Sequence, residues 1–187
     1  MARHLITRLA VLLVLAAGGC AEQPPATATA TPFNPADVMF LQMGLEQIAE
    51  GDQVAALASQ RATDPRVRAI ATELRGQWAT EAGTMERWLL GWQQPRAADP
   101  SAGAHAGHGE LHMLRPADID SLASLDKGQT FDRTAVSLLL GHLGNCVETS
   151  RMESASGAYP PARSLADGMT QDRQTQIQSL LKVAAEG

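Results

Sequence analysis

The sequence predicts an all-α protein, a four-helix bundle built from two duplicated helical hairpins that a long linker joins. Three observations lead to this prediction. Apolar residues recur at helical spacing along four long segments, capping residues stand where segments begin, and the second pair of segments repeats the first at a constant offset. Two hairpins that each carry one apolar face can bury those faces on each other as a bundle.

The first hairpin is expected over residues 35–92. Asn34 is a good N-cap, Pro35 fits the first helical position, and Asp37 lies near the positive end of the helix dipole. A second start signal and an apolar stripe at helical spacing predict another helix, which ends near Trp92. This signal and stripe consist of Thr63, Asp64, Pro65, Val67, Ile70, Ala71, Leu74, Trp78, Met85 and Leu89.

The linker and a short helix are expected over residues 93–128, and the second hairpin over residues 130–185. Pro, Gly and Ala dominate the linker, which favours irregular structure. In the second hairpin, Thr130 is expected to cap a helix from 131 to about 154. After a turn, the last helix is expected from about 162 to 185.

The two hairpins are related by a constant offset of 95 residues, which appears when Asp37 is laid on Asp132. Without any gap, this register lays Pro65 on Pro160 at the turn of each hairpin. It also matches core positions, and so it predicts an internal duplication and a bundle with a pseudo-twofold axis. The further pairs are Arg68 with Arg163, Ile70 with Leu165, Ala71 with Ala166, Leu74 with Met169 and Met85 with Leu180.

Residues 1–19 have the order of a secretory signal peptide. Arg3 and Arg8 precede an apolar run over residues 9–17, and two glycines then lead to Cys20. Small residues directly before a cysteine resemble the bacterial lipobox, in which the cysteine is acylated and becomes the first mature residue. We therefore expect a lipoprotein that is anchored through Cys20 on the outer face of a cell membrane. The alternative is ordinary cleavage and a free exported protein.

Residues 20–33 are expected to form the lipidated cysteine and a flexible tether, and residues 34–187 the helical domain. Loss of the signal peptide removes two of the 15 Lys and Arg residues and none of the 20 acidic residues, so the net charge falls from -5 to -7. That charge argues against nucleic acid as a partner. The expected partner is the membrane, and no protein partner is specified.

Short motifs in both hairpins are shared with a known family. They are DVMFLQM (37–43), Gln77, Glu81, Met85, Trp88 and FDR (131–133). Together with the repeated hairpin, these motifs resemble the DUF305 family of exported helical proteins, over about residues 34–182. The resemblance implies a ferritin-like four-helix bundle. It also implies a link to metal, because some members are implicated in periplasmic copper binding and resistance.

The motif most specific to that family, a His-His pair in each repeat, is degenerate in this chain. The first pair is replaced by Gln47 and Ile48, and the second by His142 and Leu143. A glutamate later in each repeat persists as Glu81 in the first repeat but is replaced by Gln176 in the second. We expect Glu81 to be either a partner that orients a histidine ligand or an exposed helix charge.

His142 and Cys146 are the first candidate metal ligands. They lie four residues apart, so both side chains leave one face of a helix one turn apart, as two ligands of one ion require. The duplicated register places Met43 on the matching stripe of the first helix. Thioether, imidazole and thiolate together suit copper(I) better than calcium or magnesium. The alternative is a buried cysteine that acts as a small hydrophobe beside a hydrogen-bonded histidine.

The linker holds a second candidate set, His105, His108, His112 and Met113, within nine residues. A Gly-rich segment can fold three imidazoles around a soft or borderline metal, although the ordering of the loop weakens such a site. The alternative is a solvated linker with incidental histidines.

Catalytic motifs are missing from the sequence. No histidine has a glutamate three residues before it, as a di-iron carboxylate bundle requires, and there is no nucleophile elbow, phosphate-binding glycine loop or Cys-x-x-Cys pair. We therefore expect no enzyme. The sequence predicts an extracytoplasmic protein that binds or sequesters a soft transition metal, with copper as the expected ion. The alternative is a structural or protein-interaction module that has lost the family metal site.

Overall fold

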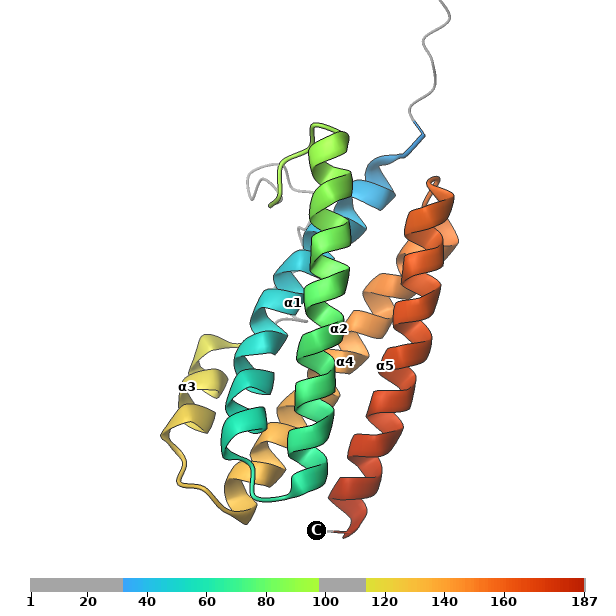
Figure 1. The fold of residues 1–187 in the computed structure, drawn as a ribbon. Coiled ribbons are helices and arrows are strands. Elements are labelled where there is room, and N and C mark those ends of the chain that lie inside the picture. The colour runs from blue at the N-terminus through green and yellow to red at the C-terminus, as the bar shows by residue number, and fades with distance from the viewer. Residues whose placement is uncertain (1–31, 98–113, 187) are drawn as a thin grey trace, which may run out of the picture. The chain divides into compact units, whose positions relative to one another are not determined.

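The structure, a computed structural model, describes residues 32–97 and 114–186. These residues form five helices and no strand (Figure 1), namely α1 (Pro35–Arg61), α2 (Pro65–Gly91), α3 (Pro116–Ser124), α4 (Gln129–Ser156) and α5 (Pro160–Glu186). None of them combines the length and the apolar character that crossing a membrane requires. The predicted signal peptide, Cys20, and the linker residues His105, His108, His112 and Met113 lie outside the described residues.

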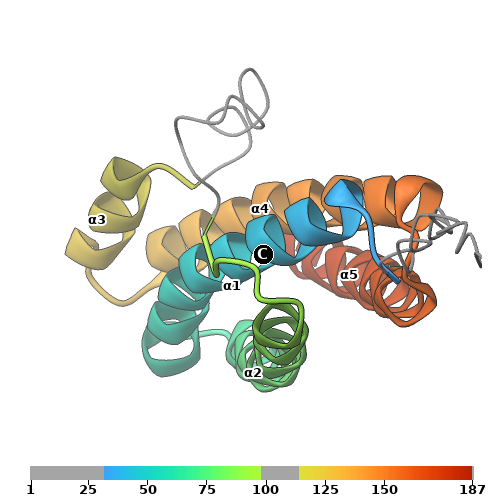
Figure 2. The ribbon, with the colours of Figure 1, turned by 90° about the horizontal axis from the view of Figure 1, so that it is seen from above.

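The four long helices form the predicted four-helix bundle. The helices of each hairpin, α1 with α2 and α4 with α5, pack along each other, and α1 also packs on α4 (Figures 1 and 2). Contacts between α2 and α5 are far fewer. The short helix α3 covers α1 and α4 from outside, and it buries Leu122 completely.

The predicted N-cap is present at α1 but not at α4. Asn34 and Asp37 form a capping box, in which each side chain accepts a hydrogen bond from the backbone N–H of the other. The prediction that Thr130 caps a helix was wrong. Helix α4 begins at Gln129, and Gly128 stands at the N-cap with φ of 150°. That backbone conformation favours glycine, so the start of α4 is set by the backbone rather than by a capping side chain.

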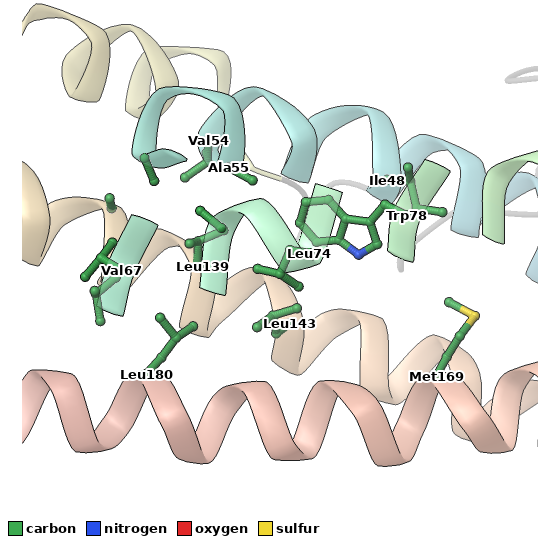
Figure 3. Packing of buried hydrophobic residues seen from close by; sticks show 14 of the residues in the cluster. Ile48, Val54, Ala55, Val67, Leu74, Trp78, Leu139, Leu143, Met169 and Leu180 are labelled. Atoms are coloured by element: carbon green, nitrogen blue, oxygen red, sulfur yellow. The ribbon is translucent and has the colours of Figure 1, made fainter. Parts of the chain in front are cut away.

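The core repeats with the predicted offset. Figure 3 shows apolar side chains from all four long helices converging, among them Leu74, Leu143 and Leu180. On α2 and α5, six of the buried positions coincide at 95 residues. They are Val67 with Ala162, Ala71 with Ala166, Leu74 with Met169, Trp78 with Arg173, Glu81 with Gln176, and Met85 with Leu180. The internal duplication is therefore present in the packing of the protein, including two positions where the repeat holds polar side chains.

Two buried aspartates tie the hairpins together in a reciprocal way. Asp132 on α4 accepts hydrogen bonds from the backbone N–H groups of Thr63 and Asp64, at 2.9 and 2.8 Å, in the turn of the first hairpin. Asp37 on α1 accepts hydrogen bonds from Ala158 and Tyr159, at 3.0 and 2.9 Å, in the turn of the second. Donors and acceptors are both related by the same offset of 95 residues, so each hairpin stabilises the turn of the other.

Candidate metal centre

His142 and Cys146 lie together inside the bundle. They stand one turn apart on α4, and their side chains are almost fully buried, with residue exposures of 1% and 3%. The distance between Cys146 Sγ and His142 Nε2 is 3.6 Å, which places a soft sulfur and an imidazole nitrogen in reach of one small ion. The donor atoms present therefore fit copper(I) in chemical type.

Burial keeps both of these groups uncharged at neutral pH. Burial, and then the positive charge of Arg173, lower the pKa of His142 to about 4, against a weaker opposite effect of the Gln47 backbone. Burial raises the pKa of the Cys146 thiol to about 12, although Arg173 opposes this shift. The side chains are therefore a neutral imidazole and a thiol, and a metal ion bound by the sulfur must displace the thiol proton.

Gly51 lets α1 approach this pair closely. A Cβ atom at Gly51 would lie 2.4 Å from His142 Nε2 and 2.7 Å from Cη2 of Trp78, so any larger residue would have to displace the imidazole. The indole of Trp78 meets the imidazole edge to face, with 5.8 Å between ring centroids. Gly51 is also the equivalent of Cys146 at an offset of 95 residues, so the first repeat has no side chain at the position where the second carries the thiol.

A layer of buried polar side chains surrounds the pair. Gln47, the equivalent of His142, donates a hydrogen bond of 2.9 Å to Oγ1 of Thr149. Glu81 on α2 accepts a hydrogen bond from Arg173 on α5, and the two form a buried ion pair. Gln176 donates a hydrogen bond to Gln77 beside them. The sparse contact between α2 and α5 is therefore polar in this layer.

The partner of Glu81 differs from both sequence-based expectations. Glu81 is 8% exposed, so it is not an exposed helix charge, and its hydrogen-bond partner is Arg173 rather than a histidine. Sequence reasoning missed Arg173, which is completely buried. A signal was present, because the offset of 95 residues places Arg173 at the position of the core residue Trp78.

The other candidate ligands, Met43 and the linker set, stay predictions. Met43 is partly exposed and lies outside the cluster of buried core residues, so its role as a ligand stays a prediction. The linker set lies outside the described residues. Within residues 32–97 and 114–186, no group of three or more His, Cys, Asp and Glu side chains is placed to hold a metal ion.

A buried pair of acidic residues lies at the turn of the second hairpin. Glu153 on α4 is 1% exposed and stands beside Asp37. Burial, followed by hydrogen bonding and repulsion from Asp37, raises the pKa of Glu153 to about 8, against a weaker opposite effect of Arg163. Burial also acts to raise the pKa of Asp37, but hydrogen bonds from Asn34, Tyr159, Glu153 and Ala158 outweigh it and hold that pKa below its usual value. Glu153 therefore carries the proton of the pair.

This proton makes stability depend on pH. The pKa of Glu153 rises from 4.5 for a free side chain to about 8 in the fold. Between these values the folded protein holds a proton that the unfolded chain releases, so stability falls as pH rises through this window. We expect the free energy of unfolding of the unmodified protein to fall by an amount on the order of 3 kcal/mol between pH 5 and 8, and we expect Glu153→Gln to remove this fall. Urea unfolding at several pH values measures the difference, and parallel pH profiles for both proteins would contradict the assignment.

Comparisons with known proteins identify the family. The family model described as "Domain of unknown function (DUF305)" matches residues 37–184. A DUF305 protein from Streptomyces coelicolor is 22% identical, with a TM-score of 0.74 over 81% of this chain and 93% of that one. A DUF305 fragment from Deinococcus radiodurans is also 22% identical, with a TM-score of 0.71 over 84% and 100% of the two chains.

A third solved structure with the same fold is CopM in a Cu(II)-bound form. It is 21% identical, with a TM-score of 0.66 over 80% of this chain and 96% of that one. A search of curated proteins found no match to the chain. The family match covers most of the chain and both hairpins, and the solved structures share the bundle. The chain therefore belongs to the DUF305 family.

Proposed function

We propose that this protein is an extracytoplasmic lipoprotein that binds or sequesters a soft transition metal, with copper as the expected ion, and that it performs no catalysis. The observation that carries the proposal is the distance of 3.6 Å between His142 Nε2 and Cys146 Sγ inside the bundle. Imidazole and thiolate are ligands that copper(I) accepts together, whereas hard cations prefer oxygen.

The charge of the surrounding layer favours a monovalent ion. Arg173 is completely buried, and its positive charge influences both His142 and Cys146. When copper(I) replaces the thiol proton, the net charge of the pair does not change. A divalent ion would add one positive charge next to a buried guanidinium, which is costly at low dielectric. This argument supports copper(I) over copper(II) at this pair.

Relatives with the same fold support metal binding as the general class. CopM has been solved in Cu(I)-bound and Ag-bound forms, and Cu(I) and Ag(I) are both soft ions. Their identities of 19 and 20% to this chain show the fold alone. Met43 is proposed as a further ligand, and His105, His108, His112 and Met113 as a weaker, exchangeable site in the linker. Cys20 is proposed as the lipid anchor on the outer face of the membrane.

A non-catalytic structural or protein-interaction module is the second candidate. Two observations favour it. The described residues hold no group of three or more His, Cys, Asp and Glu side chains placed for a metal. A thiol with a pKa near 12 also resists the loss of its proton. Under this alternative, Cys146 is a small apolar residue of the core and Arg173 belongs to a structural ion pair.

Anaerobic copper(I) titration of the mature protein against a colorimetric chelator tests the proposal. Replacement of His142 and Cys146 by Gln and Ser is expected to remove the tightest site. Replacement of His105, His108 and His112 is expected to remove only weaker binding, which falls as pH drops through about 6.5 because imidazole protonates. If Met43 is a third ligand, Met43→Leu is expected to weaken copper(I) binding, and if Met43 only packs, copper(I) binding is expected to stay unchanged. If the unmodified protein takes up no copper, the interaction module replaces this function.

A further inference from the structure

Four aromatic rings gather at one end of the bundle. Phe33 stacks on Trp92 with 4.2 Å between ring centroids, and Trp92 stacks on Trp88 at 6.5 Å. Tyr159 meets both tryptophans edge to face, at 5.5 and 5.2 Å. These four residues, which we call the aromatic end, account for four of the seven aromatic residues of the chain. Aromatic residues are therefore concentrated at this end.

The aromatic end lies where three segments meet. They are the start of α1, the end of α2 and the turn between α4 and α5, all at the upper end in Figure 1. The rings are each partly exposed. Leu90, which lies between Trp88 and Trp92 in the sequence, is 79% exposed, more than any other large hydrophobic side chain among the described residues. No charged residue occurs in the segments 32–34, 88–95 and 156–161.

The opposite end of the bundle has a different character. It is formed by the turn between α1 and α2, the start of α4 and the end of α5. Charged residues are frequent there, namely Arg61, Asp64, Arg66, Asp126, Lys127, Asp132, Arg133, Lys182 and Glu186. The two ends therefore differ in charge, and the aromatic end suits an apolar environment better than the charged end does.

The position of the proposed lipid anchor selects the same end. Twelve residues separate Cys20 from Phe33, and a fully extended chain of this length spans at most about 45 Å. Helix α1 then leads away from the aromatic end for 27 residues, or about 40 Å. Acyl chains on Cys20 would therefore keep the aromatic end within about 45 Å of the lipid, and would allow the charged end to lie about 40 Å farther away.

We propose that the aromatic end docks into the interface of the lipid bilayer, with Leu90 entering the apolar region and the tryptophan and tyrosine rings lying at the level of the headgroups. The amphipathic rings of Trp and Tyr prefer this zone, where an apolar body and a polar tip are both accommodated. The proposal rests on the lipid anchor of the proposed function. Docking orients the bundle so that the charged end, with the turn of the first hairpin, points away from the membrane.

Fluorescence quenching tests this docking. Acylated mature protein is reconstituted into phosphatidylcholine vesicles whose acyl chains carry bromine, which quenches nearby tryptophans. Two of the three tryptophans lie at the aromatic end, whereas Trp78 is only 1% exposed in the core. We expect the emission to fall by up to about two thirds relative to unbrominated vesicles. A protein that carries Trp88→Phe and Trp92→Phe reports Trp78 alone and is expected to show no quenching.

Leu90→Glu provides the sharper variant, because this side chain is largely free of packing and its change spares the fold. A carboxylate cannot enter the apolar region without a large desolvation cost, so quenching is expected to fall several-fold. Leu181→Glu is the matched control. It places the same charge on α5 toward the opposite end, at a side chain that is 46% exposed, and is expected to leave quenching unchanged.

The outcomes separate docking from anchoring. Acylated protein that floats with the vesicles but shows no quenching overturns the docking proposal and leaves the anchor intact. Equal quenching in Leu90→Glu and in the unmodified protein also overturns it. If mass spectrometry finds no acyl group, the anchor fails, and the unacylated protein is titrated with the same brominated vesicles. Quenching that Leu90→Glu removes then supports the docking surface, and its absence overturns it.

Discussion

Glu81→Leu is expected to destabilise the protein by about 3–5 kcal/mol, because it leaves a buried arginine without a counter-charge. Arg173 is 0% exposed, and Glu81 is the acidic group that accepts its hydrogen bond. The guanidinium cannot lose its proton to escape this cost, since arginine stays protonated in proteins. Urea unfolding followed by far-UV circular dichroism measures the change in the free energy of unfolding.

Removal of the arginine instead of the glutamate is expected to lower the free energy of unfolding by less. Burial raises the pKa of Glu81 even though Arg173 lies beside it, so a carboxyl group without the arginine can take up a proton and become neutral. Arg173→Met should therefore destabilise the fold less than Glu81→Leu does. The double variant is expected to recover most of the loss, because two apolar residues of similar volume can fill the same space.

Asp52→Ala serves as the control for these variants. It removes an ion pair with Arg75 whose two side chains are about 40% exposed, and such pairs contribute only about 0–1 kcal/mol. If Glu81→Leu costs no more than Asp52→Ala, water reaches Arg173 and the polar layer is not a closed interior. If the double variant is as unstable as Glu81→Leu alone, the unpaired charge of Arg173 is not the cause of the loss, and the polar layer stabilises the fold through its other contacts.

The bundle and its register could be predicted because they depend on periodicity, and periodicity is a property of the sequence itself. Apolar residues at helical spacing predicted four helices, and Asp37 laid on Asp132 aligned the two hairpins. The structure shows why that alignment holds, since each aspartate accepts hydrogen bonds from the turn of the other hairpin. A shift of the register would separate both carboxylates from their donors.

The polar interior could not be predicted in the same way. Arg173 and Glu81 are 92 residues apart in sequence, and a charged residue at core spacing can as easily lie at the edge of a buried stripe as inside it. Met43, Gln47 and Gly51 occupy one stripe of α1, so the spacing could not tell which of them faces His142. The structure gives this place to Gly51, because the missing side chain allows the closest approach.

Asp132→Ala is expected to destabilise the fold by about 3–5 kcal/mol, because two backbone N–H groups and the hydroxyl of Thr63 lose a charged acceptor. Asp37→Ala should cost less. It also removes three backbone hydrogen bonds, but it frees Glu153 from its acidic neighbour. The first hairpin has no such neighbour, since Ala58 is the equivalent of Glu153.

Hydrogen exchange distinguishes this reciprocal bracing from a general loss of stability. In Asp132→Ala, the amides of Thr63 and Asp64 are expected to lose protection first, although they belong to the other hairpin. Asp118→Ala is the control, because it removes only a partly exposed carboxylate that pairs with the exposed Arg115 at the start of α3, and it should change stability by about 0.5 kcal/mol or less. Retained protection of these two amides in Asp132→Ala would mean that the turn holds itself, and that the matched aspartates mark common descent of the hairpins rather than a requirement of the fold.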